Sequence, residues 1–245
     1  NGLSHQNSDL IMRELIEKKI IRTYGIFLFF MMTINTIPAQ TPPPMAPEVW
    51  SEPVMLENIG RGVEPSISRG GDTLVFLNGM GIQMSFRLAG VWQIPATLSS
   101  RFNYGVARNP TISADGKKIY FVDYERTGGY GSWDLWVSNW SDSLNDWDVA
   151  KNLGSNINTD VIEWFCFTPD DKNLYFGRVT GLVTNLLVSA WNDTLQQWGV
   201  PKSFDNDFLT HGEAINGLTM TKNKKKVYFS RLLDMVKHYE YELLV

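Results

Sequence analysis

The chain has 245 residues, of which 22 are Lys or Arg and 26 are Asp or Glu, so its formal net charge is −4. This weak acidity excludes a nucleic-acid-binding protein, which needs a basic surface to displace counterions. The apolar content of 43% excludes disordered and collagen-like chains, and a single cysteine excludes an internal disulfide or a multi-thiolate metal site. We therefore expect a folded protein that uses no metal, no cofactor and no nucleic-acid partner.

Residues 12–39 have the order of a secretory signal peptide. A basic stretch precedes the apolar run Tyr24–Ile37, and Pro38-Ala39-Gln40 follows. The run is shorter than the roughly 20 residues needed to span a bilayer, so a retained anchor is a weaker alternative, as is an amphipathic core helix. We predict a periplasmic or secreted protein with no stable membrane span after cleavage. The expected division is an upstream or fragment segment at 1–11, the signal peptide at 12–39, a Pro-rich lead-in at 40–49 and one folded domain at 50–245.

Two motifs alternate four times along the folded part. An apolar couplet, a turn and a second strand ending in Phe occur at 64–76, 109–121, 163–176 and 216–229. A Trp motif, with Pro or Ala three residues later and Leu or Phe six residues later, starts at Trp50, Trp92, Trp147 and Trp198. Equivalent positions are 42 to 55 residues apart, which is the spacing of β-propeller blades.

Each repeat predicts four strands. The Phe-ending strands are rich in β-branched and aromatic residues and follow Gly, Asp or Asn turns. The Trp motif supplies the fourth strand, and both faces are apolar because each blade packs between neighbours. Third strands are expected at Gln83–Leu88, Asp134–Ser138, Leu186–Ala190 and Tyr239–Leu244. We therefore predict an all-β fold, a β-propeller of four-stranded antiparallel blades.

The repeats leave the number of blades open. The fourth repeat has a third strand but no Trp motif after it, and the Trp50 motif precedes the first repeat. If the Trp50 strand completes the last blade, the ring closes with four blades. The alternative is that the four repeats are part of a larger propeller.

The second repeat resembles a known family. NPTISADGKKIYF (109–121), RTGGYGSWDLWVS (126–138) and the W-x5-LGSNIN segment (147–158) are similar to the PD-type WD40-like repeat of TolB-like bacterial proteins. The resemblance is good in the third repeat and weaker in the first and fourth. It implies an exported, envelope-associated interaction protein, although TolB-type propellers commonly have six blades.

Motifs for catalysis are missing from the sequence. It contains no G-x-S-x-G, no P-loop and no H-E-x-x-H pattern. Cys166 lies in an apolar strand, where a thiol is expected to be a small buried hydrophobe. We therefore expect a protein that is not an enzyme.

The candidate binding residues lie near the start of each first strand. Alignment on the Phe-ending strands predicts that four polar residues lie at one equivalent position, where they could form a ring at one channel mouth: Glu64, Asn109, Glu163 and Asn216. The loops before these strands add Arg61, Tyr104, Arg108, Asp160, His211 and Glu213. Such a ring would bind a peptide terminus, a sugar or a cation, whereas the structural alternative is that these groups cap strands and face water.

A second candidate is the loop Glu125–Trp133, with Arg126, Tyr130 and Trp133, because exposed Arg and aromatic side chains are common interface anchors. Trp140 and Trp191 also lie outside the repeated positions. The leading hypothesis is an exported, non-enzymatic propeller scaffold that binds a protein or peptide partner in the cell envelope. The alternative is a glycan-binding or glycan-cleaving propeller that uses Glu64, Glu163, Asp160 or Glu213.

Overall fold

The structure is a computed structural model, and it describes residues 52–79, 81–99, 106–181, 183–204, 215–221, 226–234 and 240–244. All but the first two of these residues belong to one compact unit, Val54–Val245. The predicted signal peptide, the lead-in and the Trp50 motif lie outside the described residues, so pairing of the Trp50 strand stays a prediction. Within the described ranges no helix is long and apolar enough to cross a membrane.

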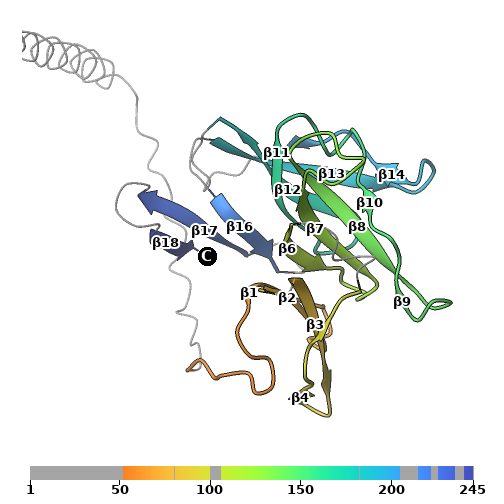
Figure 1. Cartoon of the computed structure of the whole chain (residues 1–245). Coiled ribbons are helices and arrows are strands. Elements are labelled where there is room, and N and C mark those ends of the chain that lie inside the picture. The colour runs from red at the N-terminus through yellow and green to blue at the C-terminus, as the bar shows by residue number, and fades with distance from the viewer. Residues whose placement is uncertain are drawn as a thin grey trace, which may run out of the picture. The chain divides into compact units, whose positions relative to one another are not determined.

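Four antiparallel sheets follow one another along the chain, and we call them blades 1 to 4 (Figure 1). Blade 1 contains β1 (Val63–Ile67), β2 (Thr73–Asn78), β3 (Gly81–Leu88), β4 (Val91–Trp92) and β5 (Ala96–Thr97). Blade 2 contains β6 (Ala107–Ile112), β7 (Lys118–Tyr124), β8 (Trp133–Ser141), β9 (Asp146–Trp147) and β10 (Lys151–Asn152). Blade 3 contains β11 (Ile162–Phe167), β12 (Asn173–Thr180), β13 (Val183–Asn192), β14 (Gln197–Trp198) and β15 (Lys202–Ser203). Blade 4 contains β16 (Ile215–Met220), β17 (Val227–Asp234) and β18 (Glu240–Leu244). These blades confirm the predicted all-β propeller fold.

The outer strand of blades 1 to 3 is divided into two short parts, where the sequence predicts one strand. In blade 1, β4 and β5 both pair with β3, and the chain leaves the sheet around Pro95 between them. Blade 3 repeats this arrangement around Pro201. Proline has no backbone N–H to donate to a neighbouring strand, so it is compatible with a break in the pairing, and blade 2 has the same break at Ala150.

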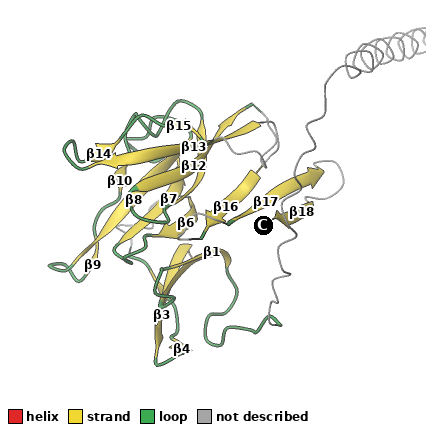
Figure 2. Ribbon diagram, turned by 180° about the vertical axis from the view of Figure 1, so that it is seen from behind, coloured by secondary structure: helices red, strands yellow, loops and turns green. Residues whose placement is uncertain are grey.

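The innermost strands β1, β6, β11 and β16 contact one another in sequence order, and Figure 2 shows β1, β6 and β16 near the centre of the blades. Hydroxyl groups connect these strands. Ser66 Oγ accepts a hydrogen bond from the Ile112 N–H at 3.2 Å, and Thr111 Oγ1 donates to the Cys166 carbonyl at 2.7 Å. Residues from all four strands line a narrow cavity of about 170 Å³ between them. The blades are therefore joined by side-chain bonds at their inner edges.

Three hydrophobic clusters join blades 1 to 4 in turn, and Trp147 and Trp198 belong to the first two, whereas Trp92 packs within blade 1 against Leu74 and Phe76. Trp92, Trp147 and Trp198 are buried at equivalent positions. Trp147 and Trp198 each make an edge-to-face contact with the tryptophan paired with it across the hairpin, Trp140 at 5.6 Å and Trp191 at 5.2 Å between ring centroids. Trp140 and Trp191 are therefore also part of the blade architecture.

Candidate functional site

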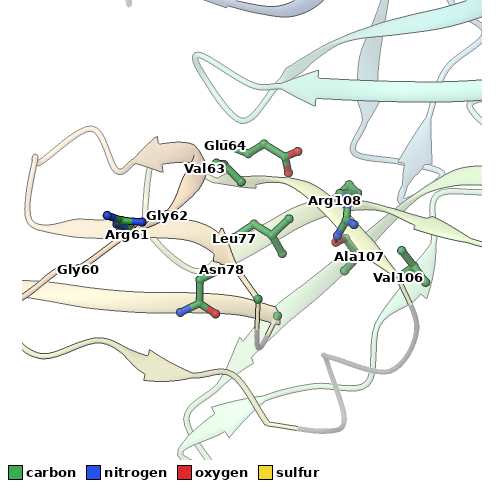
Figure 3. Close-up of a pocket in the computed structure, with 12 residues that line it drawn as sticks. Gly60, Arg61, Gly62, Val63, Glu64, Leu77, Asn78, Val106, Ala107 and Arg108 are labelled. Carbon is green, nitrogen blue, oxygen red and sulfur yellow. Dashed lines mark hydrogen bonds between the residues drawn. The ribbon is translucent and has the colours of Figure 1, made fainter.

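A cleft of about 990 Å³ lies between blades 1 and 2 (Figure 3). The loop before β1, the turn between β2 and β3 and the start of β6 form its walls. Three of the predicted binding residues line it, Arg61, Glu64 and Arg108. Figure 3 shows the two arginines on either side of Leu77, and Asn78 lies at the lower wall. The structure therefore places these three residues around one cleft between two neighbouring blades.

A β-bulge near the start of each innermost strand shapes this region. In blade 1, Glu64 and Pro65 together lie opposite Phe76, because Val63 and Ser66 pair with the residues on either side of that phenylalanine. The φ angles of Glu64 and Asn109 are 55° and 48°, a left-handed conformation that is uncommon outside glycine. Bulges of this kind change the direction of side chains at the end of a strand.

Glu64 and Asn109 connect adjacent blades. Glu64 Oε2 accepts a hydrogen bond from the Asn109 N–H at 2.6 Å. Asn109 Nδ2 in turn donates to the Trp164 carbonyl at 2.8 Å, in blade 3. These bonds are structural links of the type expected for strand caps, and only Glu64 also reaches the cleft.

Glu163 and Asn216 do not occupy the position of Glu64 and Asn109, so the four-membered ring is corrected. Asn109 lies in the bulge opposite Phe121, whereas Glu163 pairs with Arg178, two residues beyond the equivalent phenylalanine. Asn216 lies in a bulge that is also displaced from the phenylalanine of its blade. The predicted alignment is wrong by one residue in blades 3 and 4. The other three loop candidates, Tyr104, His211 and Glu213, lie outside the described residues.

Glu163 is fully buried and fixes the loop that leads into blade 3. Its carboxylate accepts hydrogen bonds from Thr159 Oγ1 at 2.8 Å, the Thr159 N–H at 3.1 Å and Arg178 Nε at 2.8 Å. Burial raises the pKa of Glu163, although the bonds from Thr159 and Arg178 act in the opposite direction. Asp160 is exposed on the same loop and is not among the described lining residues of the cleft.

Arg126 is not an exposed interface anchor. Its side chain is 8% exposed, and Nη1 donates to Asp123 Oδ2 at 2.9 Å. The guanidinium also lies 5.2 Å from the centre of the Trp136 ring and 5.6 Å from that of Phe121. Burial raises the pKa of Asp123, and the attraction of the Arg126 guanidinium acts in the opposite direction. Arg126 therefore stabilises the interior of blade 2, which corrects its expected role.

The other residues of the Glu125–Trp133 loop divide between surface and core. Tyr130 is 53% exposed and available to a partner. Trp133 is half-buried between Tyr124 and Trp164, with 5.1 Å between ring centroids in each pair. The tip of the loop is therefore exposed at Tyr130, while Trp133 packs against the neighbouring blade.

Replacing Gly131 with alanine should lower the free energy of unfolding by about 1–3 kcal/mol. A Cβ at this position would lie 2.6 Å from both the Thr159 and Val161 carbonyl oxygens, and backbone atoms cannot move aside as a flexible side chain can. Urea denaturation measures the change. Gly79→Ala is the matched control, because its Cβ would meet nothing within 4 Å, and equal effects of the two substitutions would contradict the prediction.

Comparison with known proteins yields likenesses of fold alone. No protein-family profile matches the chain, and no curated protein matches it. A putative TolB from Agrobacterium tumefaciens is 15% identical to this chain. The match covers 73% of this chain and 55% of that one, with a TM-score of 0.46. The GH43 endo-arabinanase from Bacillus licheniformis is 17% identical to this chain. The match covers 76% of this chain and 71% of that one, with a TM-score of 0.42. The tricorn protease is 9% identical, with coverage of 75% and 22% and a TM-score of 0.44. The chain thus spans about half the length of the TolB structure that it matches.

Proposed function

We propose that this β-propeller is an exported, non-enzymatic scaffold that binds an acidic group of a protein or peptide partner in the cell envelope. The observation that carries the proposal is the cleft between blades 1 and 2, where Arg61 and Arg108 line one space with Glu64. Export rests on the signal-peptide pattern of residues 12–39.

The charge of the cleft favours an acidic ligand. Its described lining residues carry two guanidinium groups and one carboxylate, so positive charge is in excess. Glu64 Oε2 already accepts the Asn109 N–H at 2.6 Å. Guanidinium groups bind carboxylates in a planar, two-bond geometry, which gives both affinity and orientation. A side-chain carboxylate or a peptide C-terminus is the group that fits this arrangement.

A binding role is favoured over glycan cleavage by the positions of the carboxylates. Most glycosidases need two carboxyl groups about 5–10 Å apart on either side of the substrate. Glu163, one of the expected pair, is buried against Arg178, and Glu64 is the single carboxylate among the described lining residues of the cleft. The same residues include no aromatic side chain on which a sugar ring would stack. Rigid scaffolds of this kind bind with little backbone movement.

The double substitution Arg61→Ala/Arg108→Ala should lower capture of the envelope partner at least about tenfold, since each good charge-assisted pair contributes about 1.5–3 kcal/mol. The full chain is immobilised, partners are captured from an envelope extract, and hexaglutamate is added as a competitor. Arg87→Ala is the matched control, because Arg87 is exposed and bonds to the Gly90 carbonyl of its own hairpin, outside the cleft. Unchanged capture by the double variant, or competition by a neutral oligosaccharide but not by hexaglutamate, would overturn the proposal.

A further inference from the structure

A second hollow, which we call the acidic groove, lies between blades 1 and 2 at the opposite ends of β1 and β2 from the cleft. Its volume is about 440 Å³. Asp72 and Phe86 line it from blade 1, and Asp115, Lys117 and Trp140 line it from blade 2. The ammonium of Lys117 lies 3.7 Å from Asp142 Oδ2, so an adjacent carboxylate offsets its charge. The groove thus combines aromatic rings with two carboxylates that take no part in the cleft.

The equivalent place between blades 2 and 3 is filled by the chain itself. There Lys118 Nζ lies 5.8 Å from the centre of the Trp191 ring, within the range of a cation–π contact. Trp191 pairs with Trp198 across its hairpin as Trp140 pairs with Trp147, so Trp191 and Trp140 are equivalent. The chain therefore shows what this tryptophan position accommodates: an ammonium group supplied by the preceding blade.

Between blades 1 and 2 the preceding blade supplies no such group. Thr73 opens β2 as Lys118 opens β7, and each pairs with the equivalent residue of its third strand. Threonine is too short to cover a neighbouring indole and carries no charge. The residue before it differs as well, because Asp72 stands where blade 2 has Lys117. At the positions equivalent to Lys117 and Lys118 of blade 2, blade 1 therefore carries one carboxylate and no ammonium group.

Both aspartates of the groove are held in the ionised form. Hydrogen bonds from Ser68 and Thr73 lower the pKa of Asp72. Burial acts to raise the pKa of Asp115, but the bonds from the Ser113 hydroxyl and the Lys117 N–H, together with the attraction of Lys118, outweigh it and leave the pKa lowered. The hydrogen bonds that Ser68, Thr73, Ser113 and the Lys117 N–H donate to these carboxylates, at 2.6 to 3.1 Å, reach Oδ1. Both aspartates line the groove, so it carries their negative charge.

We propose that the acidic groove binds the ammonium group of a lysine side chain from a protein partner, which stacks on Trp140 and pairs with Asp72 and Asp115. The bound lysine occupies the place that Lys118 occupies on Trp191. Charge complementarity identifies the occupant, since two carboxylates and a partly buried indole that line the same groove together select a cation. This site does not depend on the cleft of the proposed function, and it uses none of the cleft's lining residues.

The test is an NMR titration of the full chain, labelled with ¹⁵N at its tryptophan indoles, with N-acetylated tetralysine amide. The Trp140 resonance, assigned with Trp140→Phe, should shift and saturate. Thr73→Lys should weaken this binding at least about tenfold, because the introduced ammonium fills the groove as Lys118 fills its equivalent. Asp72→Asn keeps nearly the same side-chain shape but removes the charge. It should weaken the binding of tetralysine about three- to tenfold and reduce the dependence of that binding on salt.

Two further variants separate this proposal from the alternatives. Lys117→Asp/Lys118→Thr should make the Trp191 resonance respond to tetralysine, because it gives blade 2 the two residues that blade 1 has at the acidic groove. Arg61→Ala/Arg108→Ala should leave the Trp140 titration unchanged, so failure of the cleft and failure of the groove are distinguishable. Equal binding by wild type and Thr73→Lys, or an equal Trp140 shift with N-acetylated tetraserine amide, would overturn the proposal.

Discussion

Replacing Arg178 with methionine should lower the free energy of unfolding by about 3–5 kcal/mol at neutral pH, because it leaves a buried carboxylate without its cation. Glu163 is fully buried, and Arg178 Nε reaches its Oε1 at 2.8 Å. Arg178 Nη2 also donates to the Ile157 carbonyl at 2.7 Å, and this bond is lost as well. Urea denaturation at about pH 7 measures the change.

The deficit should shrink as the pH falls. Burial already raises the folded-state pKa of Glu163 in the native chain, and loss of the neighbouring cation raises it further. A group with a raised folded-state pKa contributes stability below its unfolded pKa, about 4.3 for glutamate, and that contribution is lost as the pH rises through the folded-state value. The Arg178→Met variant is therefore least destabilised near about pH 4 and most destabilised at about pH 7.

A double variant provides the control for this prediction. Glu163→Gln/Arg178→Met removes both charges, so it should be more stable at neutral pH than Arg178→Met alone and should show a weaker pH dependence. Two results would contradict the prediction: a deficit of Arg178→Met that is the same at both pH values, or a double variant that is less stable than the single one.

Asn158→Leu should lower the free energy of unfolding by about 1–3 kcal/mol, because the buried Leu135 N–H loses its partner, whereas the Leu135 carbonyl keeps the Leu153 N–H and Asn152 Oδ1 keeps the Gly154 N–H. The Asn158 side chain is 1% exposed, and its Oδ1 accepts the Leu135 N–H at 2.8 Å. Its Nδ2 donates to the Leu135 carbonyl at 2.9 Å and to Asn152 Oδ1 at 2.8 Å. The amide thus pairs with the backbone of β8 as a neighbouring strand would.

Asn185→Leu is the matched control for Asn158→Leu. Asn185 is exposed on β13, and the bonds from its Nδ2 to the Arg178 carbonyl and to Thr180 Oγ1 are both 3.5 Å long. Its replacement should change the free energy of unfolding by no more than about 0.5 kcal/mol. The Asn158 prediction fails if urea denaturation gives the two variants the same stability.

The repeat pattern predicts the blades because one physical requirement acts four times. Each sheet must be apolar on both faces, so Phe76, Phe121 and Phe176 recur at one position and are buried there. Alignment of Glu163 with Asn109 fails because Asn109 lies 12 residues before Phe121, whereas Glu163 lies 13 residues before Phe176. The strand pairing follows this one-residue difference and places Glu163 elsewhere.

The site was predictable only in part. The sequence identifies Arg61, Glu64 and Arg108 as loop residues, but which loops face each other depends on the packing of blade 1 against blade 2. The structural role of Arg126 had a local signal, because Asp123 lies three residues before it across a turn. The role of Asn158 was signalled by the LGSNIN segment, where asparagine is unusual beside the buried Ile157. Prediction of the acidic groove requires the strand register of three blades, and no single sequence motif contains that information.

The divided outer strand has a consequence for behaviour in solution. A continuous edge strand presents a row of unpaired N–H and C=O groups, on which another chain can build a sheet and begin to aggregate. In blades 1 to 3 this edge consists of two-residue pieces, and Pro95 or Pro201 interrupts it in two of them. No piece is long enough to template a strand of ordinary length. The same interruption that shortens the blade therefore protects its rim against edge-to-edge association.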